Sequence, residues 1–77
     1  MKCVWLVLKL YCYIAEDENG QEIGWKSDIL SIEGVYEYDL FAKIEADKLN
    51  AQLEDWQKYD ESESDYYVYS VVKKKVG

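Results

Sequence analysis

Carboxylates are the most numerous side chains in this sequence that could do chemistry. Sixteen acidic residues face nine lysines, for a net charge of −7. The densest run flanks Lys58 and consists of Glu54, Asp55, Asp60, Glu61, Glu63 and Asp65. A solvated run of this kind lacks the burial that tunes a carboxyl for acid–base catalysis. It also lacks the glycine and glutamate spacing of a calcium loop, so we expect no metal site. What remains is electrostatic attraction of a basic partner.

Aromatic side chains form the second candidate group. They occupy alternate positions in two apolar segments near the chain ends: Trp5, Tyr11, Tyr13, Tyr67 and Tyr69. Tyrosine and tryptophan are enriched in protein interfaces and also serve as platforms on which bases stack. We expect these rings to project from the side of a sheet that faces away from a helix. A symmetric partner, a folded loop, a different protein or a stacked base could each cover them.

The absent residue types narrow the function further. The sequence contains no histidine and no arginine, which removes the commonest general base at neutral pH and the best bidentate phosphate ligand. We therefore expect neither an enzyme, nor a cofactor, nor direct nucleic-acid binding. Residues 16–65 hold all sixteen acids and four lysines, a net −12, while the flanking segments carry only lysines. This segregation is either an ordinary solvated surface or a negative face that steers the protein to a basic partner.

The elements that must position these side chains begin with a strand at residues 4–15. Its even positions are uniformly apolar and are expected to face the helix: Val4, Leu6, Leu8, Leu10, Cys12 and Ile14. Asn19-Gly20 predicts a two-residue hairpin turn. That turn would place Ile14 opposite Trp25 and Glu16 opposite Ile23, in a second strand at residues 21–27. Residues 28–33 either continue this strand beyond a bulge or form a short extra strand.

One amphipathic helix is predicted at residues 40–58, with Asp39 as its N-cap. Its apolar stripe has helical spacing and consists of Ala42, Ala46, Leu49, Leu53 and Trp56. Leu40, Ile44 and Ala51 lie on the opposite side, where Leu40 and Ile44 either pack under residues 34–38 or form an exposed contact patch. A closing strand is predicted at residues 66–76. The order predicts a single α+β domain over residues 1–77, an antiparallel β-β-α-β sheet with the helix on one face.

Three short motifs give the chain a resemblance to known proteins. They are Gly34-Val35-Tyr36, the helical Ala42, Ala46 and Leu49, and Tyr66-Tyr67-Val68-Tyr69. In these features the chain resembles a group of short uncharacterised β-β-α-β proteins of bacteria and their phages. By type, it is similar to the small acidic inhibitors of anti-CRISPR and anti-defence systems. The resemblance implies the fold and an origin in a phage or mobile element, and it carries over no catalytic residue.

The expected function is therefore binding. We expect a non-enzymatic inhibitor that occupies a basic nucleic-acid-binding site of a host protein. The alternatives are a nucleotide-binding sponge and a small homodimeric adaptor. Cys3 and Cys12, about 30 Å apart in one extended strand, are too distant for a disulfide. We expect reduced thiols, a cytoplasmic location and no membrane span, because no apolar stretch reaches the required length.

Overall fold

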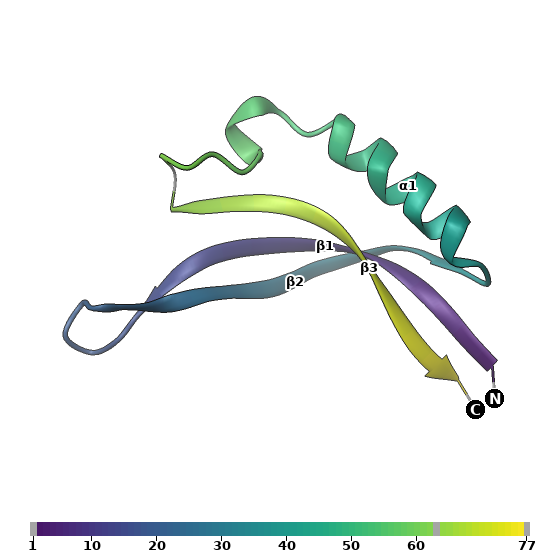
Figure 1. Ribbon diagram of the computed structural model, residues 1–77, viewed down its shortest axis with the longest axis horizontal. Coiled ribbons are helices and arrows are strands. Elements are labelled where there is room, and N and C mark those ends of the chain that lie inside the picture. Colours follow the sequence, from purple (N-terminus) through teal and green to yellow (C-terminus); the bar gives the residue numbers. More distant parts are fainter. Residues whose placement is uncertain (1, 63, 77) are drawn as a thin grey trace.

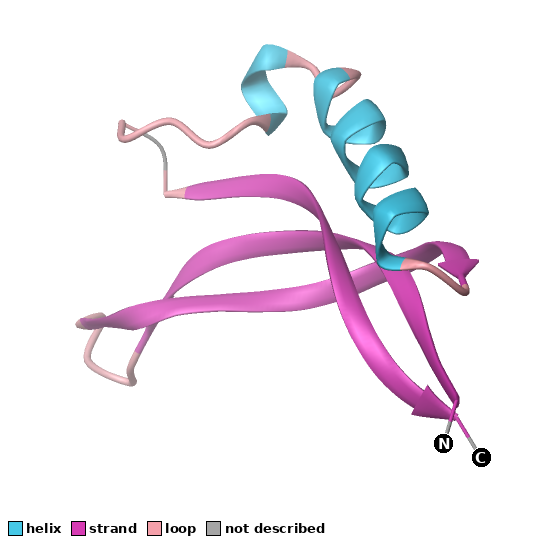
Figure 2. Cartoon of the chain, turned by 45° about the vertical axis from the view of Figure 1, so that its right-hand side comes forward, coloured by secondary structure: helices cyan, strands magenta, loops and turns pink. Residues whose placement is uncertain are grey.

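The computed structural model describes residues 2–62 and 64–76. Within this part of the chain, three strands, one α-helix and one short 3-10 helix follow in the order β1 (Lys2–Glu16), β2 (Glu22–Tyr36), α1 (Asp39–Ala51), η1 (Asp55–Gln57) and β3 (Asp65–Val76). The strands form an antiparallel sheet in the order β2-β1-β3, and α1 lies over one side of it (Figures 1 and 2). The predicted α+β fold with β-β-α-β order is confirmed.

The central position of β1 follows from its sequence. It is apolar on both faces, as strands buried between neighbours tend to be. It pairs with β2 from Trp5 to Glu16 and with β3 from Lys2 to Tyr13. The two outer strands consequently run parallel to one another, and α1 connects them across β1.

The hairpin between β1 and β2 differs from the predicted two-residue turn. The Asp17 carboxylate accepts hydrogen bonds from the backbone N–H groups of Asn19 and Gln21, each at 2.9 Å. Gly20 adopts a positive φ of 79°, and its N–H donates to the Asp17 carbonyl. A three-residue loop of this kind ends in a left-handed residue, which glycine supplies without strain. Ile14 does pair with Trp25 as predicted, but Glu16 pairs with Glu22 and not with Ile23.

Strand β2 continues through residues 28–33, so the bulge alternative is correct. The register shifts at three points and leaves Ile23, Leu30 and Glu33 without a partner in β1. Bulges bend a strand and interrupt the regular pattern of its backbone hydrogen bonds. The outer edge of β2 is therefore irregular along its length.

Helix α1 packs on the face of the sheet that the sequence pattern did not predict. Val7 and Ala42 are fully buried with Ala46, and Trp5, Tyr36, Leu49, Tyr69 and Val71 pack around them. Trp5 and Val7 are odd-numbered residues of β1, so the even positions do not face the helix. The two alanines let the helix backbone approach Val7 closely, and the rings of Trp5 and Tyr69 fill the space at its sides.

The helix is shorter than predicted at its C-terminal end. It ends at Ala51, and its N-cap is Tyr38 in place of Asp39. The N–H groups of Gln52 and Leu53 donate to carbonyls three residues earlier, which tightens the chain out of the α-helical path. Asn50, in the last turn, directs its amide to the outer edge of β3. Its Nδ2 donates to the Tyr69 carbonyl at 2.9 Å, and the Tyr69 N–H donates to its Oδ1 at 2.8 Å.

These two bonds satisfy the outward backbone groups of Tyr69 much as a further strand would. They fix the end of α1 against β3 and protect one point of a sheet edge. Cys3 and Cys12 are free thiols, as predicted. Across residues 2–62 and 64–76, the structure contains no helix that is both long enough and apolar enough to cross a membrane.

Candidate protein-binding site

The segment that follows α1 brings two rings to the start of β3. Trp56, in η1, lies edge-on to Tyr67 with 6.1 Å between ring centroids, and Tyr59 lies 5.2 Å from Tyr66. Successive strand residues point to opposite faces, so Tyr66 and Tyr67 lie on different sides of the sheet. Residues 56–59 therefore place one ring on each side of the start of β3.

Three tyrosines gather with Trp56 on the helix side of the sheet, beyond the end of α1. The Tyr11 ring centroid lies 5.5 Å from that of Tyr13 and 5.2 Å from that of Tyr67. Lys9 extends its Nζ over the Tyr67 ring at 5.7 Å. Trp56 remains 70% exposed even though it contacts Tyr67. We call Tyr11, Tyr13, Trp56 and Tyr67 the aromatic cluster.

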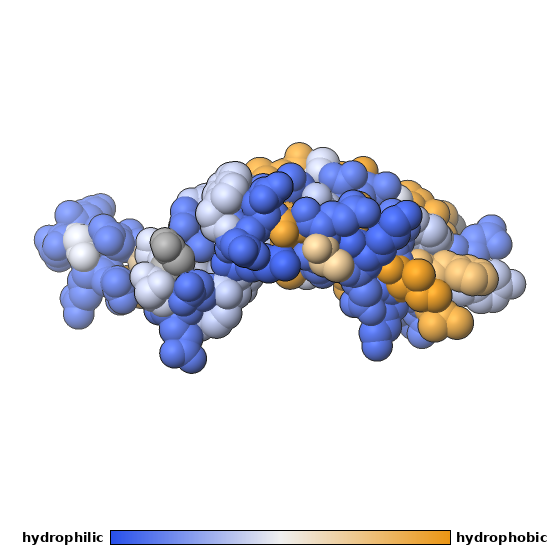
Figure 3. Space-filling model, turned by 90° about the horizontal axis from the view of Figure 1, so that it is seen from above, coloured by the Kyte–Doolittle hydropathy of each residue, from blue (hydrophilic) through white to orange (hydrophobic). Residues whose placement is uncertain are grey.

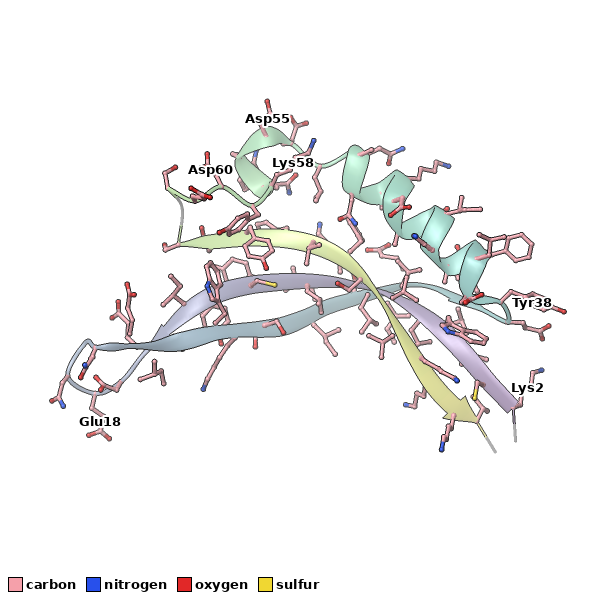
Figure 4. All side chains as sticks on the ribbon, viewed as in Figure 1. Lys2, Glu18, Tyr38, Asp55, Lys58 and Asp60 are labelled. Atoms are coloured by element: carbon pink, nitrogen blue, oxygen red, sulfur yellow. The ribbon has the colours of Figure 1, made fainter. Side chains whose placement is uncertain are left out.

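Carboxylates flank Trp56 in the sequence, and one contacts Tyr11. Those of the loop before β3 are exposed: Glu54, Asp55, Asp60 and Glu61. Asp55 and Asp60 project outward from this loop in Figure 4. Asp65, at the start of β3, is half-buried, and its Oδ2 accepts a hydrogen bond of 2.7 Å from the Tyr11 hydroxyl. Glu63 lies outside the described residues. We call this loop, with Asp65 and the aromatic cluster, the acidic end.

The local geometry of the loop explains its outward display of charge. Glu54 caps η1, and its backbone N–H donates to Gln57 Oε1 at 2.9 Å. The Asp60 Oδ1 accepts from the Ser62 N–H at 3.1 Å. These contacts hold the backbone in a defined turn while each carboxylate keeps oxygen lone pairs that face solvent. The loop can therefore present its charge without rearranging first.

The hairpin tip makes this half of the molecule still more acidic, and the opposite end is basic. The tip carries Glu16, Asp17, Glu18 and Glu22, and Glu18 lies far from Lys2 in Figure 4. The basic end carries Lys2 together with three consecutive lysines at residues 73–75. Lys2 forms an exposed ion pair of 3.2 Å with Glu37. The segregation of charge along the sequence has thus become a segregation along the long axis of the molecule.

The Tyr11–Asp65 pair makes the acidic end sensitive to high pH. The hydrogen bond to Asp65 is the main cause that raises the pKa of Tyr11 to about 12, and desolvation and the negative charge of Asp65 add to it. A phenol with a raised pKa in the folded state stabilises that state at pH values below its unfolded pKa of about 10. This contribution is lost as pH rises from about 10 to about 12.

We expect Tyr11→Phe to remove this part of the pH dependence. The free energy of unfolding of the wild-type protein is expected to fall more steeply between those two pH values than that of the variant. Denaturant titrations at several pH values measure the difference. Tyr13→Phe is the matched control, because it removes a neighbouring phenol and leaves the Tyr11–Asp65 bond in place. Parallel pH profiles for wild type and Tyr11→Phe would contradict the assignment.

The structure brings only some of the sequence-predicted aromatic residues together. Tyr11, Tyr13 and Tyr67 form a cluster, whereas Trp5 and Tyr69 pack around the core beneath α1. The prediction that all five rings face away from the helix is wrong, because α1 lies on their side of the sheet.

The sequence pattern missed Trp56 as a surface residue. Its helical spacing placed it in the core stripe, but α1 ends before it. With the helix ended, Trp56 falls in η1, where its ring reaches Tyr67 and remains largely open to solvent.

A second exposed group lies on the outer side of α1. Leu40 and Ile44 are 60% and 55% exposed, so they do not pack under residues 34–38, and their role as a contact patch stays a prediction. Phe41 and Tyr38 extend it, with 5.9 Å between their ring centroids. Seen from the helix side, hydrophobic colouring gathers toward the end of the molecule that carries the start of α1, and hydrophilic colouring covers the hairpin end (Figure 3). The sequence pointed to Leu40 and Ile44 through their helical phase but did not single out Phe41.

Among the described residues, no group of three or more cysteine or acidic side chains lies close enough together to hold a metal ion. Comparison with known proteins found no matching family model, no matching curated protein and no matching solved structure. Any function must therefore be inferred from the chain itself.

Proposed function

We propose that this protein acts by binding, without catalysis, to a basic surface of another protein through its acidic end. The observation that carries the proposal is the aromatic cluster, with Trp56 70% exposed, on the same loop as the exposed carboxylates Asp55, Asp60 and Glu61. The partner class that fits is a nucleic-acid-binding protein, whose basic groove the carboxylates would occupy in place of phosphates. The protein would thus be an inhibitor of the kind that phages and mobile elements direct at host machinery in the cytoplasm.

The arrangement of rings and charges supports a protein partner. Protein interfaces typically combine buried aromatic anchors with a polar rim, and a few aromatic residues supply most of the binding energy. Trp56 and the three tyrosines provide the anchors, and Asp55, Asp60 and Glu61 provide the rim. Charges at a rim mainly speed association, whereas buried anchors mainly slow dissociation.

The same surroundings disfavour the nucleotide-sponge alternative. A nucleotide stacked on Tyr11 or Tyr67 would bring its phosphates close to Asp65 and the carboxylates of the neighbouring loop. Lys9 already lies over the Tyr67 ring, and Lys26, the register partner of Tyr13, and Lys58 are outnumbered by these carboxylates. Like charges repel most strongly where water is partly excluded. The acidic end is therefore better suited to a cation-rich protein surface than to an anionic ligand.

The experiment begins with capture of partners from a bacterial lysate on the immobilised protein at low and high salt. A retained nucleic-acid-binding protein is then purified, and its association and dissociation rates are measured. The triple substitution Asp55→Ser, Asp60→Ser and Glu61→Ser is expected to slow association roughly tenfold or more at low salt, with a smaller effect at high salt. Trp56→Ala is expected mainly to speed dissociation.

The matched control removes the same number of charges away from the acidic end, at Glu33, Asp39 and Asp47. It is expected to leave the association rate close to that of wild type. A competition assay with labelled DNA then checks whether the protein displaces nucleic acid from its partner. Equal association rates for the triple variant and wild type, or a partner that keeps its DNA when saturated with this protein, would overturn the proposal.

A further inference from the structure

The face of the sheet opposite α1 is largely apolar, and among the described residues α1 does not cover it, although the Tyr59 ring packs on one end of it against Trp25 and Tyr66. It consists of the even-numbered residues 4–14 of β1 together with their register partners in β2 and β3. We call it the open face. Leu8 lies at its centre, flanked by Ile32 of β2 and Ser70 of β3. Leu10 is flanked in the same way by Ile29 and Val68.

The outer strand displays this face to solvent most openly. Ile29, Ile32 and Val35 are 64%, 60% and 59% exposed, although each is aliphatic and each pairs with a leucine of β1. Isolated exposed apolar residues are ordinary, but a contiguous aliphatic layer on one side of a sheet marks an interaction surface. Together these residues resemble one half of a hydrophobic core.

The exposed surface area and the radius of gyration independently indicate a surface that another molecule covers. The chain exposes 5834 Å². A compact monomer of 9.1 kDa exposes about 4900 Å², so the excess is about 900 Å². One partner in a standard stable interface buries about 800 Å². The radius of gyration, 14.7 Å, likewise exceeds the value of about 11.5 Å for a compact domain of this length.

The irregular edge of β2 makes edge-to-edge pairing a poor alternative. Ile23, Leu30 and Glu33 are bulged residues that interrupt the outward row of backbone donors and acceptors. Proteins use bulges to prevent the addition of a further strand. Apolar burial is therefore available on the open face, while regular strand addition at β2 is not.

We infer that the open face binds a second copy of this chain, face to face, in a symmetric dimer. The charges on the face select one of two aligned arrangements. Glu16 and Glu22 form a register pair at the hairpin end, and Lys74 lies opposite Val4 at the other end. Copies stacked with their β1 strands parallel would bring Glu16 and Glu22 against the same residues of the partner. Antiparallel stacking brings them to Lys74 instead, so opposite charges meet at both ends.

This inference concerns a surface other than the acidic end and stands whether or not the proposed inhibitory function holds. Sheets that pack face to face keep their strands within about 30° of each other and lie about 10 Å apart, which suits interdigitating leucine and isoleucine side chains. The dimer would leave the aromatic cluster and the outer side of α1 available for other partners.

The test is the mass of the wild-type protein by sedimentation or light scattering over a range of concentrations, with the thermal midpoint measured in parallel. We expect a species of twice the chain mass and a midpoint that rises with protein concentration, because association stabilises the folded state by mass action. Ile32→Glu is expected to raise the dimer dissociation constant by about a hundredfold or more. Ile44→Glu, on the exposed side of α1, is the matched control and is expected to leave it unchanged.

A wild-type monomer with a concentration-independent midpoint overturns the inference, as does dissociation by Ile44→Glu with no effect of Ile32→Glu. If Ile32→Glu does not fold, the concentration dependence of the wild-type midpoint still gives the answer. The antiparallel stacking of the two β1 strands is tested separately by Lys74→Glu, which is expected to weaken the dimer. Adding Glu16→Lys and Glu22→Lys is expected to restore it, whereas Lys75→Glu, on the helix side, is expected to have little effect.

Discussion

Replacing Ala46 by glutamate is expected to unfold most of the protein or to lower its free energy of unfolding by about 3 kcal/mol or more. Ala46 is buried with Val7 and Ala42 at the point where α1 meets β1. A glutamate there must either bury an unpaired carboxylate or push the helix away from Val7. A chain of this length holds roughly 4–12 kcal/mol in all, so the loss is a large share of its stability.

Ala51→Glu is the matched control for this change. Ala51 is the last residue of the same helix and is exposed, so the same substitution is expected to change the free energy of unfolding by less than about 0.5 kcal/mol. Denaturant unfolding followed by circular dichroism, at one protein concentration for all variants, measures both. Similar losses for the two variants would show that the contact between Ala46 and Val7 does not support the fold.

Replacing Asn50 by leucine is expected to lower the free energy of unfolding by about 1–3 kcal/mol. Leucine has nearly the same shape but cannot accept from the Tyr69 N–H or donate to the Tyr69 carbonyl, and both bonds are part-buried. Asn50→Asp keeps the acceptor but places a carboxylate oxygen against the carbonyl. It is therefore expected to lose stability at neutral pH as well.

Amide hydrogen exchange separates the loss of this clamp from a general loss of stability. The Tyr69 amide is expected to exchange much faster in Asn50→Leu than in wild type, beyond the change seen at central β1 amides. Gln52→Leu is the control, because Gln52 is exposed just beyond the helix. Unchanged relative protection at Tyr69 would show that water replaces the Asn50 amide at little cost.

The two faces of β1 show where reasoning from the sequence reached its limit. Both faces are rich in apolar side chains, so the nearly continuous apolar run located the strand and indicated its central position but did not identify the covered face. The even positions were more uniformly aliphatic and were predicted to face α1, yet the helix covers Trp5 and Val7. A helix that connects parallel strands of one sheet lies on the face set by the handedness of the crossover. Because that handedness is almost always right-handed, the covered face depends on the strand order, which is a property of the whole sheet.

The sequence likewise predicted only part of the candidate site correctly. The carboxylates at Asp55, Asp60 and Glu61 were evident as a charge run, and they are exposed as such runs generally are. Trp56 was expected in the core because its spacing continued the helical stripe. The early end of α1 moved it to the surface beside Tyr67. Helix propensity and periodicity contain no information about the tertiary contact of Asn50 with β3. The helix predicted from them therefore extends beyond the observed end of α1.

Patterns in the amino-acid sequence were enough to predict the β-β-α-β order, the central strand, the hairpin pairing of Ile14 with Trp25 and the separation of acidic from basic segments. These follow from local patterns: alternation, turn residues and charge. The face that α1 covers, the end of α1 and the rings that lie beside the carboxylates became evident from the three-dimensional structure alone. Each of these depends on contacts between residues far apart in the chain, whose free energies no local pattern contains.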